Sequence, residues 1–553
     1  MGASGGAPRD SIDRRGFLKA GGLGLAGVML FGASGCGGGN QGGRAKGGGT
    51  LKTSLDSDPP TLDPALAYDF VSWPLIHAMF LTPITYDASG KGFVPWAAKA
   101  VPKPENGGRR YVFDIRPGIK FVDGEPTDAA AFKYAIERIM DPKTKSPVTG
   151  FYTNIVGAKA YQKRPRGGIK GIKVLSRYRL QFDLEKPDQV FLQTMCVPSA
   201  SAVPRKAVEK YGADFPGHVV ANGPFKLGEW KRGARLVLEK NDDYKNPSGR
   251  PETTEARLDE IDFSIGVDLH VALLRVEQGS SQVAGGGIPS SDFAAVMNNP
   301  KWKDYIRHGT LNVLEYFYVN TQKKPWSDPR VRRALQYAID KKRVVQVING
   351  RATVADQILP PNMPGYDPSI KGYPYDPEKA RSLLREAGFK KGTPLDFWTA
   401  KDPDGDRISQ VIQQNLSDVG IDATIRNVSF SEYLSQTKAG KTDAGLANWY
   451  QDYPDPSDFL DILFNSDQIP ANNYSRYSNP KVDRELERAQ YMLDRRKRLA
   501  LYQKIQRQIL SDDPIVPLYY PVEYDFVSPK VGGFRVHPVW TGSLYAQWYL
   551  KRS

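Results

Sequence analysis

Four aspartates recur at a spacing of three residues in the stretch NWYQDYPDPSDFLDILF, residues 448–464. Carboxylates spaced in this way could bind a metal ion, act as a pair of catalytic acids or contact a cationic ligand. They could also cap a helix and have no role in chemistry. The acids and the aromatic residues among them are Asp452, Asp455, Asp458, Asp461, Trp449, Tyr450, Tyr453, Phe459 and Phe464.

The prolines of this stretch separate the four aspartates from one another. Pro454 and Pro456 exclude a helix before about residue 456. Asp455 is then predicted to be the N-cap of a helix whose first residue is Pro456, with Asp458 at the third position of a capping-box-like start. Asp461 is expected in solvent or at a lobe surface. A calcium loop is not expected, because the central glycine that it needs is missing.

Asp452 is the aspartate without a structural assignment. It lies in an extended part of the stretch, flanked by Trp449, Tyr450 and Tyr453. One interpretation is an ion pair with a nearby Lys or Arg. The other is an anionic group for the ammonium of a ligand, with the rings supplying apolar and cation–π contacts.

The N-terminal 49 residues predict an export signal followed by a tether. Arg14 and Arg15 precede a glycine-rich apolar stretch, residues 20–31, as in a twin-arginine signal. ASGC, ending at Cys36, resembles a lipobox whose cysteine is lipidated, although Ala33 stands where leucine is usual. We expect residues 1–35 to be the signal segment and residues 36–49 a flexible Gly-rich tether. An uncleaved anchor helix is the alternative.

Composition indicates a soluble globular protein of two large lobes or several domains, since the 553 residues are 40% hydrophobic and 25% charged. The net charge is +15, and +13 without residues 1–35. Because Lys and Arg are spread along the chain, the positive net charge favours a location near an anionic membrane over binding to nucleic acid. Cys196, the cysteine outside the export segment, is expected to be buried.

The body of the chain predicts strands and hairpins first and an α/β region later. Tyr111, Phe113 and Ile115 stand at every second position, as the residues on one face of a strand do. Asp328 followed by Pro329 predicts a helix start. A strand, a helix and a strand follow one another over residues 394–428, which predicts a βαβ unit. A long charged helix or helix pair is expected at 480–511.

Five stretches of the chain resemble, in the same order, solute-binding protein family 5, the peptide-type substrate-binding lipoproteins of ABC importers. They are LDSDPPTLDPALA, YVFDIRPGIKFVDGEPTDAAAFKYAIERIMDP, NGPFKLGEWKRGARLVLEKNDDY, VNTQKKPWSDPRVRRALQYAIDKKRVV and NWYQDYPDPSDFL. The resemblance implies an α/β, two-lobed, periplasmic-binding-protein-like clamp of type II, with the extra domain of peptide-binding members. Its first lobe would comprise 50–310 and 523–553, with an inserted subdomain at about 76–204, and its second lobe 311–522.

The resemblance also implies a function. The protein would capture oligopeptides or similar amine-bearing solutes in an interlobe cleft, outside the cytoplasm, and deliver them to ABC permease subunits. Asp452 aligns with the aspartate that holds the N-terminal amine in peptide-binding members, and Trp449, Tyr450 and Tyr453 would surround it. A monomer anchored by a lipid on Cys36 is expected, at the outer face of the cell membrane or in the periplasm. The family also takes nickel chelates, haem, sugars and opines, so the ligand stays open.

Enzyme functions find little support in the sequence. The five histidines are scattered and show no H-E-x-x-H pattern. We therefore expect no catalytic residue, no metal, no cofactor and no nucleic-acid partner. Two alternatives stay open: an exported carbohydrate hydrolase with a carboxylate pair across a cleft, and a solute sensor of the same fold that does not transport.

Overall fold

The computed structural model describes residues 48–540 and 544–551. The predicted export arginines Arg14 and Arg15, the predicted lipidation site Cys36 and almost all of the predicted tether lie outside these residues. The described residues contain two groups of sheets. We call the part around the four-stranded and three-stranded sheets the first lobe, and the part around the seven-stranded sheet the second lobe.

The four-stranded sheet of the first lobe joins two segments that are far apart in sequence. β1 (Thr50–Leu55) runs parallel to β9 (Glu260–Ile265), with Leu51 opposite Ile261. The sheet continues with β8 (Arg235–Lys240) and β7 (Phe225–Lys231). Every second side chain of β9 is buried, because one sheet face packs on α1 (Ser72–Met79) and α5 (Arg205–Tyr211).

The three-stranded sheet has its own hydrophobic core. Its order is β4 (Arg110–Asp114), β6 (Arg179–Asp183) and β5 (Ile172–Ser176). The predicted alternation over residues 111–115 is confirmed, since Tyr111, Phe113 and Ile115 are buried. Cys196 is buried in the same core, as expected. The other elements around this core are α2 (Ala129–Met140), β2 (Ile84–Tyr86), β3 (Phe93–Pro95), α3 (Ala158–Lys163) and α4 (Phe191–Thr194).

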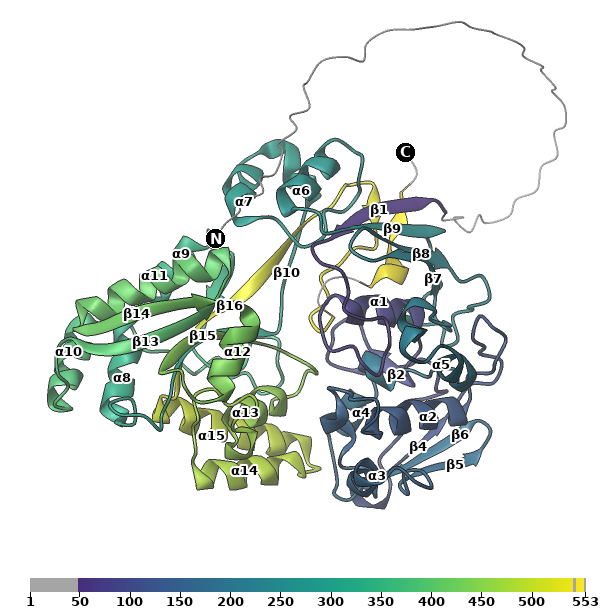
Figure 1. Ribbon diagram of the computed structural model, residues 1–553, viewed down its shortest axis with the longest axis horizontal. Coiled ribbons are helices and arrows are strands. Elements are labelled where there is room, and N and C mark those ends of the chain that lie inside the picture. The colour runs from purple at the N-terminus through teal and green to yellow at the C-terminus, as the bar shows by residue number, and fades with distance from the viewer. Residues whose placement is uncertain (1–47, 541–543, 552–553) are drawn as a thin grey trace, which may run out of the picture. The chain divides into compact units, whose positions relative to one another are not determined.

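The second lobe is a mixed sheet covered by helices on both faces (Figure 1). Its strands, in spatial order, are β10 (Ile306–Thr310), β16 (Ile515–Phe526), β11 (Val313–Val319), β15 (Ala444–Tyr450), β13 (Thr393–Ala400) and β14 (Ile421–Val428), with β12 (Ala352–Val354) beside β16. One face carries α8 (Pro329–Ala338), α9 (Lys341–Val347), α10 (Pro377–Glu386) and α11 (Pro403–Asp418). The other carries α12 (Phe430–Lys438), α13 (Ser457–Phe464), α14 (Pro480–Gln490) and α15 (Arg495–Asp512).

The local predictions for the second lobe are confirmed. Asp328 caps α8, and Pro329 is the first residue of that helix. β13, α11 and β14 form the βαβ unit, with the two strands parallel and Thr393 opposite Ile421. The charged segment after residue 480 is a helix pair, α14 and α15.

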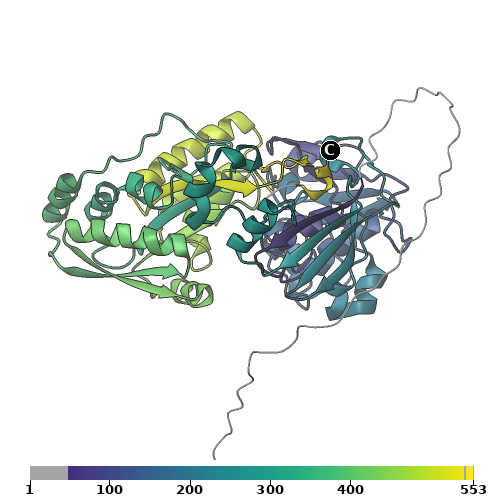
Figure 2. The ribbon, with the colours of Figure 1, turned by 90° about the horizontal axis from the view of Figure 1, so that it is seen from above.

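Two strands connect the lobes. β10 pairs antiparallel with the last residues of β16, so that Thr310 lies opposite Val522 and Arg307 opposite Asp525. β16 is the long yellow strand that leaves the second lobe in Figures 1 and 2. Beside it lie α6 (Leu269–Glu277) and α7 (Ser290–Met297), and the short strands β17 (Val531–Gly532) and β18 (Tyr549–Leu550) follow. Among the helices of the described residues, none has the length and apolar character needed to cross a membrane.

Candidate functional site

Asp452 lies in the turn between β15, which ends at Tyr450, and α13, which begins at Ser457. Its side chain is half-buried. Its Oδ2 accepts a hydrogen bond of 2.8 Å from the hydroxyl of Tyr68. Tyr68 belongs to the first lobe, in the segment between β1 and α1. Asp452 is therefore at the junction of the two lobes, where a ligand can touch both.

One interpretation of the sequence is an ion pair between Asp452 and a Lys or Arg. The partner of the Asp452 carboxyl is instead the neutral hydroxyl of Tyr68. Burial raises its pKa to about 7, while the hydrogen bond from Tyr68 acts in the opposite direction. No lysine or arginine of residues 48–540 and 544–551 forms an ion pair with it. A carboxylate in this position gains free energy when a ligand brings a cation to it.

Asp458 holds the backbone of Asp452 in place, a role that the sequence did not reveal. Its side chain is fully buried, and Oδ2 accepts the backbone N–H of Asp452 at 2.9 Å and the indole N–H of Trp449 at 3.3 Å. The predicted capping-box-like role is wrong. The N–H of Asp455, which a capping box would place on Asp458, donates instead to the carbonyl of Tyr453.

Asp458 also holds a proton more firmly than Asp452 does. Burial, followed by the charge of Asp452, raises the pKa of Asp458 well above its usual value. Its Oδ1 is buried without a hydrogen-bond partner in the described part of the chain. The two carboxyls titrate as a pair, and Asp452 is the one that loses its proton more easily.

Asp455 and Asp461 have structural roles. α13 begins one residue later than predicted, and the Asp455 carboxylate accepts the N–H of Ser457 at 3.0 Å, as a capping residue does. The same carboxylate forms a buried bidentate ion pair with Arg498, at 2.6 and 2.8 Å. Asp461 is half-buried rather than solvated, because its Oδ1 accepts a hydrogen bond from the side chain of Asn465 at 2.9 Å.

The three aromatic residues predicted for the site have different surroundings. The ring of Tyr450 is half-buried and lies 4.6 Å from the ring of Phe70 in the first lobe. Tyr453 is buried, with its ring 6.2 Å from that of Phe151, also in the first lobe. Trp449 is anchored by its bond to Asp458 and packs against the core under α12–α15. Trp449 and Tyr450 are therefore both half-buried, whereas Tyr453 is buried.

Sequence reasoning missed several polar groups near this junction. Tyr68 stands 384 residues before Asp452, and nothing local connects the two. Glu523 and Asp525 interrupt the otherwise apolar strand IVPLYYPVEYDF of β16, and charged residues in such a strand are a signal that could have been used. No group of three or more His, Cys, Asp and Glu side chains in the described residues is arranged to hold a metal ion.

Comparison with known proteins agrees with this architecture. The model of bacterial extracellular solute-binding proteins, family 5 middle region, matches residues 92–471. The di/tripeptide-binding protein 1 of Pseudomonas aeruginosa is 27% identical over 83% of this chain and 86% of its own length. The dipeptide-binding protein of Escherichia coli is 27% identical over 96% of this chain and 98% of its own.

A solved structure extends the likeness to three dimensions. The periplasmic binding protein DppA from Helicobacter pylori, in complex with the peptide STSA, superposes with a TM-score of 0.76 at 26% identity. The match covers 92% of this chain and 99% of that one. The predicted two-lobed α/β clamp is thereby confirmed. Because the family model covers more than half of its length, the chain belongs to the bacterial extracellular solute-binding proteins of family 5.

Proposed function

We propose that this protein captures short peptides, or similar amine-bearing solutes, and delivers them to the permease of an ABC importer. The observation that carries the proposal is Asp452, a half-buried carboxyl at the lobe junction with a neutral hydrogen-bond partner. The relatives named di/tripeptide-binding and dipeptide-binding protein support the same ligand class. Their role in binding also supports solute capture over catalysis.

In this proposal the N-terminal ammonium of the ligand is bound by Asp452. The hydrogen bond that the backbone N–H of Asp452 donates to Asp458 keeps the turn rigid, and the hydroxyl of Tyr68 donates to the Asp452 carboxylate from the opposite lobe. A buried carboxylate–ammonium pair needs further hydrogen bonds to offset its desolvation, and these come from the ligand backbone once the lobes close. Tyr450 and Phe70 supply apolar contact beside it.

We further propose that the lobes divide where β10 and β16 cross, at about 310/311 and 522/523. The pairing of Thr310 with Val522 supports this division, because the two connecting strands are hydrogen-bonded at this point. The first lobe then comprises 50–310 and 523–553, and the second comprises 311–522. The separate core of the three-stranded sheet supports an inserted subdomain at about 76–204 within the first lobe. A closing rotation about two paired strands is a common hinge motion.

Peptide binding is tested by isothermal titration calorimetry with trialanine and N-acetyl-trialanine. We expect trialanine to bind and the acetylated peptide to bind at least tenfold more weakly, since acetylation removes the ammonium that Asp452 would hold. Native mass spectrometry of protein purified without added ligand is expected to show a co-purifying peptide. No co-purifying solute, together with no thermal shift across a library of di-, tri- and tetrapeptides, would contradict the peptide assignment.

We also propose that the protein is exported by the twin-arginine route and anchored at the outer face of the cell membrane by a lipid on Cys36. Arg14 and Arg15 would be the export signal. Cys36→Ser is expected to move the protein from the membrane fraction to the soluble fraction, since a lipid with more than one acyl chain holds firmly. Mass spectrometry of the N-terminal peptide measures the lipid directly. A Cys36→Ser protein that stays with the membrane would favour the uncleaved anchor instead.

A further inference from the structure

A cavity of about 290 Å³ lies beside Tyr450, on the side of the junction where β16 enters the first lobe. Its volume is at the lower end of the range of about 300–1,000 Å³ for small-molecule sites. Its described lining contains three carboxylates and no lysine, arginine or histidine. The lining residues used below are Asp56, Glu523, Asp525, Phe70, Tyr450 and Tyr545. Acidic side chains without a basic side chain in the described lining favour a cation over an anion in this cavity.

Glu523 and Asp525 are the two deepest acids of the cavity. They are separated by one residue on β16, so their side chains point to the same face of the strand. Asp525 is only 7% exposed, and its Oδ2 is buried without a hydrogen-bond partner in the described part of the chain. Burial raises the pKa of both carboxyls, and the charge of Glu523 raises that of Asp525 further.

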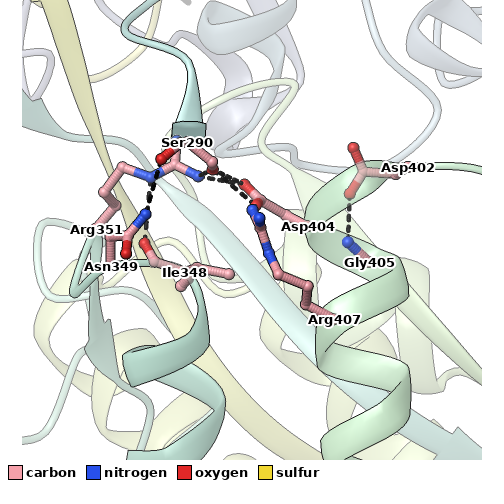
Figure 3. A network of polar contacts seen from close by, with 8 residues as sticks. All are labelled: Ser290, Ile348, Asn349, Arg351, Asp402, Asp404, Gly405 and Arg407. Carbon is pink, nitrogen blue, oxygen red and sulfur yellow. Dashed lines mark hydrogen bonds and ion pairs between the residues drawn. The ribbon is translucent and has the colours of Figure 1, made fainter. Parts of the chain in front are cut away.

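Arg351 is the arginine whose charge acts on Glu523, and its guanidinium already has other partners. Arg351 lowers the pKa of Glu523 through its charge. Its guanidinium, however, forms an ion pair with Asp404 and a hydrogen bond with Ser290, and Arg407 pairs with the same aspartate (Figure 3). Arg351 therefore has an anionic partner of its own, in addition to its charge interaction with Glu523.

An unpaired buried carboxyl lowers the stability of a protein unless it binds something. Asp525 has neither a hydrogen bond to support the fold nor a cation to balance its charge among the described residues. The aromatic rings of Phe70, Tyr450 and Tyr545 also line the cavity, and ring faces attract ammonium and guanidinium groups. Unpaired acids beside aromatic rings are groups that suit a cation.

We propose that this acidic cavity binds the ammonium or guanidinium group of a basic side chain in the ligand, and that the protein therefore selects peptides containing lysine or arginine. The inference rests on the proposed function, whose ammonium site Asp452 is two residues from Tyr450 in the cavity wall. An extended peptide advances about 3.3 Å per residue, so a side chain within the first few residues reaches the cavity while the N-terminus stays on Asp452.

The test compares tripeptides that carry one lysine or one Nε-acetyl-lysine, with alanine elsewhere, at each of the three positions. Acetylation keeps the side chain and removes its charge. By calorimetry we expect the lysine peptide to bind at least tenfold more tightly than its acetylated partner at one position. Asp525→Asn and Glu523→Gln are each expected to remove most of this preference and to leave the affinity for the acetylated peptide unchanged.

Asp422→Asn is the matched control, because it removes one negative charge from an exposed position on β14 outside the cavity. It is expected to leave the preference intact. Asp525→Asn is also expected to raise the melting temperature of the free protein, since a buried unpaired acid is replaced by a neutral isostere. If Asp525→Asn does not fold, the affinities for the lysine and acetyl-lysine peptides are compared between wild type and Glu523→Gln alone.

The outcomes separate this inference from the proposed function. Equal binding of lysine and acetyl-lysine peptides at all three positions would overturn the inference and leave peptide binding standing. If no peptide binds but 1,5-diaminopentane does, and Asp525→Asn abolishes that binding, the cation comes from a free diamine, and both the peptide assignment and the side-chain proposal are overturned. If neither kind of probe binds the folded wild-type protein, the cavity is not a cation site.

Discussion

Asp452→Asn is expected to weaken the binding of a tripeptide with a free N-terminus by at least about 30-fold, which corresponds to about 2 kcal/mol. The asparagine keeps the size of the side chain and still accepts a hydrogen bond from Tyr68. It loses the negative charge, so the ligand ammonium is buried without a counter-ion. Calorimetry near neutral pH measures the change directly.

The pH dependence of affinity gives a second readout of the same group. The pKa of Asp452, raised to about 7 by burial, means that the free protein loses this charge as the pH falls. An ammonium ligand binds the ionised form, so we expect wild-type affinity to fall about 50-fold between about pH 7 and pH 5, while the peptide amine stays protonated. Above about pH 8 the amine loses its proton and affinity falls again. In Asp452→Asn the acidic limb of this profile is expected to disappear.

Two controls make the result specific to Asp452. An N-acetylated tripeptide is expected to bind wild type and Asp452→Asn with similar affinity, because it brings no ammonium. Asp461→Asn changes an acid on the neighbouring helix whose bond is to Asn465, and it is expected to leave affinity unchanged. Unaltered affinity of Asp452→Asn for the free tripeptide, or an unchanged pH profile, would show that another group holds the amine.

The local structure around this site follows closely from its sequence. Pro454 and Pro456 delay the helix until Ser457, and Asp455 caps its start, because both effects act over a few residues of backbone. The error at Asp458 is also local. The N–H of Asp455 donates to the carbonyl of Tyr453 rather than to Asp458, and the carboxyl of Asp458 accepts the N–H of Asp452 instead.

The partners that decide the chemistry could not be predicted in the same way. Tyr68 reaches Asp452 from the other lobe, and Glu523 and Asp525 enter the cavity only because β16 passes from one lobe to the other. Such contacts depend on how distant segments pack, which periodicity and spacing do not encode. The ordered family stretches predicted the clamp, but not which side chains meet within it.

Arg498→Met is expected to destabilise the second lobe by about 3–5 kcal/mol, because it leaves the Asp455 carboxylate buried without its partner. Both side chains of this pair are almost fully buried, and the guanidinium also donates to the carbonyl of Ala489 at 2.9 Å. Arg498 thereby connects α15 to Asp455, which lies three residues after Asp452 and just before α13. Equilibrium urea unfolding, followed through the transition of the second lobe, measures the loss.

The dependence of stability on pH gives a second test of the ion pair between Asp455 and Arg498. Burial alone would raise the pKa of Asp455, but the charge and hydrogen bonds of Arg498 outweigh burial and hold this pKa below its usual value. Because the folded-state pKa is depressed, the contribution to stability is complete above about pH 3.9, the unfolded value, and is lost as the pH falls through the folded-state value. Arg498→Met is expected to remove this contribution.

Lys504→Met is the matched control on the same helix. Lys504 pairs with Glu485 at 2.7 Å, but its side chain is largely exposed, so its loss is expected to cost less than about 1 kcal/mol. The double variant Asp455→Asn with Arg498→Met removes both charges and is expected to recover part of the stability lost in Arg498→Met. Equal destabilisation by Arg498→Met and Lys504→Met would mean that the buried pair does not hold the site's helix in place. In that case the Asp452 turn would be held by the hydrogen bonds with Asp458 and Tyr68, without a contribution from the buried pair.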